Sequence, residues 1–240
     1  PKFSDIQNLY QILSKYVYFS PLSRVQFEKT NTKRPAKILK VFVVQNLITK
    51  EPVYIENIKV NGATLYDFTS MASTPATFTN VDLLRLLQNV KDKYDKDEYF
   101  INLYPSIEGN NYMIDVVEYK FGQLKISGNT KTKTYTFDDL IKISSGDYAS
   151  RKVLRETYVE IYKTQFFDNI DFDITPSGTS ILNVTLLLKE KEKKFNFLGG
   201  GTWGPPGEGK EWYEGFAAQM QLSAINPFGY GQNFSSTLSL

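Results

Sequence analysis

One pattern occurs three times in this chain and constrains the fold more than any other feature. Each copy places an aromatic pair at the start of an alternating segment and an aliphatic residue three positions later. The pairs are Tyr18-Phe19, Tyr99-Phe100 and Phe166-Phe167, and the aliphatic residues are Leu22, Leu103 and Ile170. The copies lie about 65 to 80 residues apart, whereas solenoid units usually run about 20 to 50 residues. The sequence therefore predicts a tandem array of small domains.

The second copy lies in a segment with a complete set of element signals. One strand ends at the turn-forming pair Asn61-Gly62. Asn80 is suited to cap a helix that mixes an apolar and a polar face. We expect, in order, a strand over 54–60, a short helix near 64–71, a helix after Asn80, and strands over 99–107 and 112–119. The predicted order is strand, helix, helix, strand, strand.

The third copy repeats that order. Its first strand is expected over 123–127, where Leu124-Lys125-Ile126-Ser127-Gly128 repeats the pattern of Ile58-Lys59-Val60-Asn61-Gly62. Helices are expected from about Thr136 and from about Ser150, and strands over 167–174 and 181–189. The second helix carries one apolar stripe, which is what covering a three-stranded sheet requires.

The two ends of the chain differ from this middle part. The first 50 residues carry only a helix over 3–14 and two strands, which is the back half of such a unit. After residue 194, three segments alternate apolar with small or polar residues: 195–203, 216–224 and 234–240. Alternation over about 10 residues between turns is typical of transmembrane barrel strands. A soluble antiparallel sheet with one wet face would show the same alternation.

Together these features resemble the polypeptide-transport-associated (POTRA) domains and barrel start of outer-membrane assembly factors of the BamA and TamA type. The resemblance rests on the element order, on the first strands that end at Gly62 and Gly128, and on the 166–172 strand. It rests also on the 186–191 ending and on Asn226–Gln232, which is similar to the family's Asn-x-x-Gly-x-Gly turn between early barrel strands.

The resemblance implies an α+β fold of tandem POTRA modules followed by the first strands of an incomplete antiparallel β-barrel. Each module would have β-α-α-β-β order, with a three-stranded sheet covered by two helices. The expected domains are an incomplete module at 1–50, a module at 51–120, a barrel-proximal module at 121–193, and a truncated barrel start at 194–240.

Composition excludes several other functions. The 28 Lys plus Arg and 26 Asp plus Glu give a net charge of +2, which provides no concentrated positive charge for nucleic acid. The chain has no Cys and no His, so thiol chemistry, imidazole bases and the commonest zinc ligands are missing. We therefore expect no enzyme, no catalytic residue, no cofactor and no metal site.

Three local motifs do not change that expectation. Gly204–Lys210 fits the start of a phosphate-binding loop, but Glu211 stands where a Ser or Thr hydroxyl belongs and no helix follows. Asp168, Asp171 and Asp173 lack the Gly and the distal Glu of a calcium loop. The adjacent carboxylates Asp138 and Asp139 point to different parts of a helix surface, which does not support a hydrolase.

The fold itself indicates a binding mechanism, because a three-stranded sheet leaves strands with unpaired backbone groups that can take up an extended chain. The resemblance places that edge in each module's second strand, here 17–26, 100–108 and 167–174. We favour the third module. Its predicted polypeptide-binding edge consists of Phe167, Asp168, Asn169, Ile170, Asp171, Phe172, Asp173 and Ile174.

The resemblance further implies that strand 195–203 lies at a weak barrel seam. The seam residues are Phe195, Phe197, Gly199, Gly200 and Gly201. Consecutive glycines supply no side chains for packing, which weakens a strand, although they also mark close approach of a neighbouring backbone.

The implied function is a periplasmic receptor that captures unfolded outer-membrane proteins and passes them to the barrel for insertion. The expected partners are unfolded outer-membrane proteins, accessory assembly proteins, and outer-membrane lipid through the barrel. The expected location is the bacterial outer membrane, with the modules in the periplasm. A two-partner secretion pore that exports one passenger polypeptide is the alternative.

Overall fold

The computed structural model describes residues 3–20, 23–29, 37–71, 75–192, 195–205, 207–209, 211 and 215–239. Leu22 of the first repeat, and Pro206 and Lys210 of the phosphate-loop-like segment, lie outside the described residues. The chain forms two compact units, Pro1–Glu118 and Tyr119–Leu240. Each unit is described by itself.

The first unit begins with a helix and a hairpin. Helix α1 spans Phe3–Ser14, and strands β1 (Arg24–Lys29) and β2 (Lys37–Phe42) pair antiparallel. Of the predicted 17–26 edge, only the last three residues belong to β1. Phe19 instead makes an isolated bridge to Gln45.

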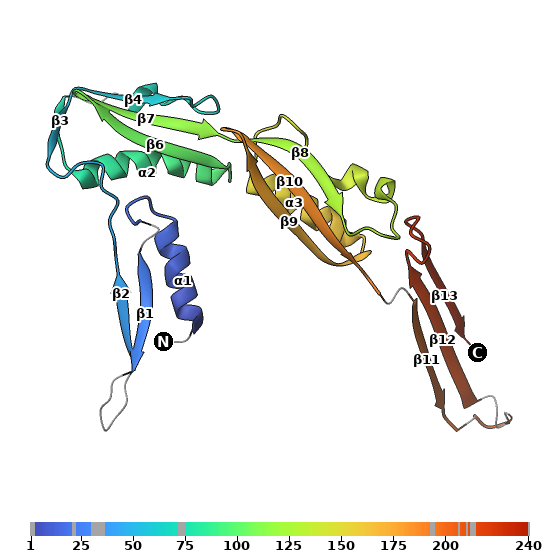
Figure 1. Ribbon diagram of the computed structural model, residues 1–240. Helices are drawn as coiled ribbons and strands as arrows, with labels where there is room; N and C mark the ends of the chain where they lie inside the picture. The colour runs from blue at the N-terminus through green and yellow to red at the C-terminus, as the bar shows by residue number, and fades with distance from the viewer. Residues whose placement is uncertain are drawn as a thin grey trace. The chain divides into compact units, whose positions relative to one another are not determined.

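The rest of the first unit is a three-stranded sheet with one long helix against it. Strands β4 (Asn57–Asn61), β7 (Asn111–Glu118) and β6 (Ile101–Glu108) lie in that order, with β4 parallel and β6 antiparallel to β7. Helix α2 (Asn80–Lys96) lies along one face (Figure 1). Short strands β3 (Val53–Ile55) and β5 (Ala76–Phe78) pair at one end, and the expected 64–71 helix is a single 3-10 turn, η1 (Thr69–Met71).

The core of this sheet lies between α2 and the central strand β7. Both elements contribute side chains that are almost fully buried: Leu83, Leu84, Val90 and Tyr94 from α2, and Tyr112, Ile114 and Val116 from β7. The apolar stripe of the helix therefore covers the sheet, as the sequence pattern predicts.

The cap of α2 is Thr79, not Asn80 as the sequence suggested. The Thr79 hydroxyl accepts a hydrogen bond from the Asp82 backbone N–H, and the Asp82 carboxylate accepts one from the Thr79 N–H. This reciprocal pair satisfies two helix-end donors at once. Asn80 is the first helical residue, and its side chain is left available for contacts with the preceding segment.

The second unit repeats the same sheet. Strands β8 (Lys120–Ser127), β10 (Ile181–Glu190) and β9 (Phe167–Ser177) lie in that order, with β8 parallel and β9 antiparallel to β10. Helix α3 (Arg151–Lys163) covers one face (Figure 1). The helix expected from about Thr136 is two 3-10 turns, η2 (Thr134–Thr136) and η3 (Asp138–Leu140).

The second unit ends in an antiparallel sheet of three strands, β11 (Phe195–Trp203), β12 (Phe216–Ile225) and β13 (Asn233–Ser239). The predicted α+β class is confirmed. In the predicted order of strand, helix, helix, strand, strand, the first helix is reduced to 3-10 turns in both repeats. Among the described residues, no helix combines the length and the apolar character that crossing a membrane requires.

Candidate polypeptide-binding edge

The first strand of each module ends at a position that only glycine can occupy. Gly62 and Gly128 have φ values of 75° and 96°. A Cβ at either position would lie well inside 3.0 Å of a carbonyl oxygen of the central strand, that of Val116 or of Leu188. The repeated glycine therefore lets the chain leave the sheet directly against its parallel neighbour.

A glutamate at the end of each central strand holds the loop that follows this glycine. Glu118 accepts hydrogen bonds from the backbone N–H groups of Thr64 and Leu65, both at 2.9 Å, and from the Tyr94 hydroxyl at 2.5 Å. Glu190 accepts hydrogen bonds from the N–H groups of Lys131 and Thr132. The two carboxylates thus fix equivalent loops in the two modules.

The environment of Glu118 changes its protonation. Burial alone raises the pKa of this carboxyl, but the hydrogen bonds from Leu65, Thr64 and Tyr94 favour the charged form and together outweigh burial. The pKa of Glu118 therefore lies below its ordinary value.

The aromatic pairs of the repeat follow a sharp turn at the end of each helix. Glu98 and Gln165 directly precede the pairs and have φ values of 61° and 60°, which turns the chain out of the helix. Phe166 and Phe167 are buried, and the Phe167 ring meets Phe137 edge-on at 5.3 Å. The repeated pattern therefore anchors the start of the edge strand to the core.

All eight residues of the predicted edge lie in β9, and β9 pairs only with β10 within its sheet. Phe167 and Ile170 are buried, and Phe172 and Ile174 are half-buried. The polar members are exposed: Asp168, Asn169, Asp171 and Asp173. The strand thus turns one side to the core and an acidic side to solvent, as the alternation predicts.

Two observations show which backbone groups of β9 face the open side. Proline fits an edge strand only with its nitrogen away from the partner, and Pro176 lies opposite Leu182 of β10. The Phe172 N–H donates to Asp171 Oδ1 at 2.8 Å rather than to β10. Because backbone groups alternate along an antiparallel strand, those of Ile170, Phe172 and Ile174 point outward together.

Asp168 interrupts this alternation at the start of β9. Lys189 lies opposite Asn169, but Glu190 lies opposite Phe167, so Asp168 is an extra residue in the strand. Such a bulge ends regular pairing. The regular open edge therefore runs from Asn169 to Ser177, and it lacks one donor, at Pro176 near its end.

The matching edge of the first unit is different. Strand β6 has Pro105 in its middle, opposite Ile114 of β7. Since the Pro105 nitrogen faces away from β7 and carries no hydrogen, the open side lacks a donor at that position. Beside β6 lies a groove of about 430 Å³, lined by Leu103 and Pro105 and also by Leu47 and Ile48 of the preceding segment.

That preceding segment is hydrogen-bonded to α2 through amide side chains. The Ile48 N–H donates to Asn80 Oδ1 at 2.7 Å, and Asn80 Nδ2 donates to the Asn46 carbonyl at 2.8 Å. The Val17 N–H donates to Gln88 Oε1 at 2.9 Å. The chain therefore occupies part of the surface beside its own β6.

The predicted seam residues lie in β11, at one edge of the last sheet, and all are exposed: Phe195, Phe197, Gly199, Gly200 and Gly201. A Cβ at Gly200 would meet no described atom within 4 Å, and one at Gly201 would come no nearer than 3.4 Å to a neighbour. Close packing of another backbone does not explain these glycines in the described part of the chain.

The Asn226 turn, between β12 and β13, docks onto the loop that Glu190 holds. Asn226 is 2% exposed, and its Nδ2 donates to Thr132 Oγ1 at 3.0 Å. The Gly229 carbonyl accepts from the Lys133 N–H at 2.9 Å, and a Cβ on Gly229 would collide with the Lys131 carbonyl. This turn therefore fastens the last sheet to the third module.

Sequence reasoning missed Glu118 and Glu190. Glu190 lies within a run of charged residues, a pattern typical of a solvent-exposed segment. The one sequence signal for its role is that Glu118 and Glu190 occupy the same position, at the end of the last strand of each repeat. The acidic residues of β9 do not form a metal site: among the described residues, no group of three or more acidic side chains could hold a metal ion.

Comparison with known proteins finds one family match, in the second unit. Residues 119–191 match the family model described as "POTRA: Surface antigen variable number repeat". No curated protein sequence matches the chain.

Solved structures with a similar fold include CdiB from Escherichia coli and CdiB from Acinetobacter baumannii. The first is 16% identical over 98% of this chain and 42% of that chain, with a TM-score of 0.56. The second is 14% identical over 98% of this chain and 45% of that chain, with a TM-score of 0.53. POTRA1-3 of the periplasmic domain of Omp85 from Anabaena is 13% identical over 79% of this chain and 80% of that chain, with a TM-score of 0.47.

The chain spans less than half the length of the two CdiB chains, and identities this low show the fold alone. The repeated first-strand glycine, the helix-to-edge turn and the family match agree at the same place in the sequence. Residues 119–191 of this chain are therefore similar to the POTRA domain family in sequence and in fold.

Proposed function

We propose that this chain is the periplasmic receptor region of an outer-membrane assembly factor, and that it captures unfolded outer-membrane proteins by adding an extended segment to β9. In this proposal the modules at 1–50, 51–120 and 121–193 precede the barrel start at 194–240. Captured segments then pass to the barrel, whose edge strand β11 is the seam.

The observation that carries the proposal is the open side of β9. Backbone groups of Ile170, Phe172 and Ile174 face outward on a strand whose inner side is held by buried Phe167 and Ile170. Strand addition draws affinity from main-chain hydrogen bonds, so one edge can accept many sequences. That tolerance suits a receptor for diverse unfolded chains.

A test follows from the alternation of backbone groups in an added strand. Two peptides with the sequence of one outer-membrane strand are each methylated on alternate amide nitrogens, in opposite phase. The phase that removes the donors facing β9 should abolish binding, whereas the other phase should retain it. Amide chemical shifts of residues 169–177 report the site. Equal binding of both peptides, or shifts confined to other elements, would refute strand addition at β9.

The secretion pore is a second candidate, because the likeness to CdiB fits it equally well. The two candidates differ in selectivity. A receptor for many substrates should bind strands from several unrelated outer-membrane proteins within about tenfold of one another, since backbone pairing dominates the affinity. A pore dedicated to one passenger should bind segments of that passenger and reject the others.

A further inference from the structure

The open edge of β9 has features that select among extended chains. We propose that it prefers amphipathic strands with Lys or Arg on one face, and that the Asp171 carboxylate guards the edge by occupying the Phe172 N–H. This inference rests on the proposed function, because it specifies the chemistry of the segment that β9 takes up.

The guard is a hydrogen bond in the middle of the edge. Asp171 Oδ1 accepts the Phe172 N–H at 2.8 Å, and that N–H points to the side where an added strand would pair. An incoming carbonyl must therefore replace the carboxylate. Once released, the Asp171 carboxylate needs a new partner, and a cation on the incoming strand supplies one.

The charge on the outer face of β9 reinforces this preference. Asp171 and Asp173 are exposed and lie opposite Leu187 and Thr185 of β10, which carry no charge. No ion pair involves either carboxylate among the residues that the structure describes.

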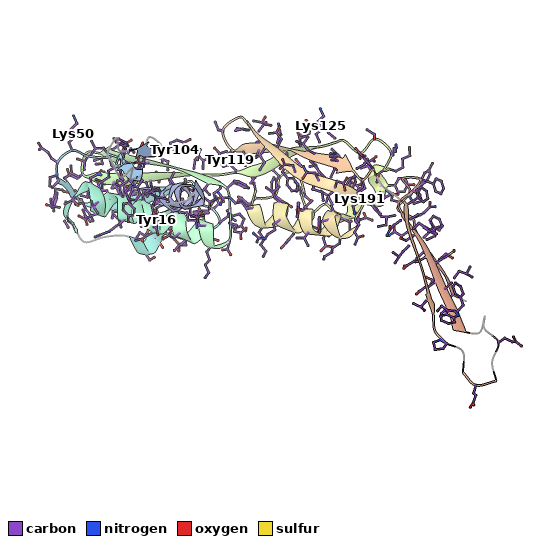
Figure 2. The ribbon with its side chains drawn as sticks, turned by 90° about the horizontal axis from the view of Figure 1, so that it is seen from below. Tyr16, Lys50, Tyr104, Tyr119, Lys125 and Lys191 are labelled. Carbon is purple, nitrogen blue, oxygen red and sulfur yellow. The ribbon has the colours of Figure 1, made fainter. Side chains whose placement is uncertain are left out.

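Positive charge on this face lies at Lys189 of β10, which is exposed and opposite Asn169, and further across the sheet on β8. Lys125 pairs with Thr185, and Figure 2 shows its side chain projecting on the side of the sheet away from α3. An added strand would stand on the other side of β9, where its alternate residues would lie beside Asp171 and Asp173. Opposite charges in such cross-strand positions stabilise pairing.

The inner side of the edge favours apolar and aromatic residues. Near the start of β9 lies a groove of about 640 Å³, in which the aromatic side chains of Tyr162 and Phe167 lie beside polar and charged ones, Lys163, Gln165, Asp168 and Lys191. The Tyr162 ring is stacked on Tyr158 at 5.8 Å and is 60% exposed. A residue of an added strand on this side would cover the exposed aromatic surface.

Three peptides of one apolar sequence test the preference, with Lys, Gln or Glu at the alternate positions beside Asp171 and Asp173. Fluorescence anisotropy measures their binding to the whole 240-residue chain. The Lys peptide should bind about three- to tenfold more tightly than the Gln peptide, and the Glu peptide more weakly than both, because two cross-strand pairs contribute. This order should weaken in high salt.

The variant Asp171→Ala separates the guard from simple charge attraction. It frees the Phe172 N–H, so the Gln peptide should bind more tightly, while the Lys peptide loses a partner and should bind more weakly. Asp139→Ala removes an exposed carboxylate of the same module away from the edge and should leave both affinities unchanged.

The outcomes distinguish this inference from the proposed function. Equal affinities of the three peptides would overturn the charge preference. If the two N-methylated peptides still differ in affinity, strand addition itself would be unaffected. Changes of the same sign for both peptides in Asp171→Ala would overturn the guard. Absence of binding by all three peptides would overturn the inference together with the proposed function.

Discussion

The sheet β4-β7-β6 of the first unit and the sheet β8-β10-β9 of the second share a frame but differ at the edge. In both, the chain leaves the first strand at a glycine that lies close to a carbonyl oxygen of the central strand. A glutamate then accepts hydrogen bonds from the loop that follows. In β9 the outward groups of Ile170, Phe172 and Ile174 are uninterrupted and the proline, Pro176, lies near the end of the strand. In β6 the proline, Pro105, lies in the middle, and a groove beside this strand is shared with the chain's own preceding segment. One frame therefore supports two edges that differ in where an outward backbone donor is missing and in what lies beside them.

The largest expected effect tests the shared frame. Gly128→Ala should destabilise the third module by about 3 kcal/mol or more, because positive φ strain adds to a collision with the Leu188 carbonyl. Gly146→Ala is the matched control, since Gly146 has φ of 93° and no described neighbour within 4 Å of a Cβ. It should cost about 1 kcal/mol. Denaturant unfolding by circular dichroism measures both, and equal losses would contradict the role of the carbonyl contact.

The next effect concerns the glutamate of the second module. Glu118→Gln should cost about 2 kcal/mol at neutral pH, since hydrogen bonds to a charged acceptor contribute about 1.5–3 kcal/mol each and Gln keeps only part of them.

The Glu118 prediction also has a pH signature. Because the folded-state pKa of Glu118 is lowered, its contribution is present above the unfolded-state pKa and is lost as the pH falls through the folded-state value. Unfolding of the chain and of Glu118→Gln, followed from pH 7 into the acid range, should therefore converge at low pH. A constant difference between them would show that the charged form is not what stabilises the loop.

A smaller effect is expected where the last sheet meets the third module. Asn226→Ala removes the buried hydrogen bond to Thr132 and the one that Asn226 Oδ1 accepts from the Gly231 N–H, and should cost about 1–2 kcal/mol. Hydrogen exchange should speed up both in the turn and in residues 130–133. The exposed Gln232→Ala is the control and should leave exchange unchanged. Faster exchange in the turn alone would show that the turn does not fasten the loop.

The smallest effect concerns the difference between the edges. Pro105→Ala restores a donor to the open side of β6 and should change stability by less than about 1 kcal/mol. Peptide binding near β6, monitored by the amide signals of residues 101–108, should appear or strengthen. If the amide signals of β6 do not change, peptide binding at this edge is limited by the groove and the preceding segment rather than by the missing donor.

Much of the frame could be predicted from sequence. The repeated Gly62 and Gly128 predicted where the first strands end, and the alternation in 167–174 predicted the buried and exposed sides of β9. The carbonyl that makes each glycine necessary could not be predicted, because it belongs to a parallel strand more than 50 residues away.

The remaining differences have local causes. Thr79 caps α2 because it forms a reciprocal pair of hydrogen bonds with Asp82. The side chain of Asn80 instead accepts a hydrogen bond from the Ile48 N–H. The segment 134–140 is short and forms 3-10 turns, with Phe137 buried in the core and Leu140 packed partly buried against it. The guard at Asp171 depends on which way the Phe172 N–H points, which residue types alone do not reveal.

The central claim is that β9, and not β6, captures extended chains. A photoreactive residue at Asn169 on β9 or at Tyr104 on β6 places the same probe on an exposed site of each edge. With an unfolded outer-membrane protein, the account predicts strong crosslinking from position 169 and little from position 104. Equal yields at both positions, or a yield from position 104 alone, would contradict it.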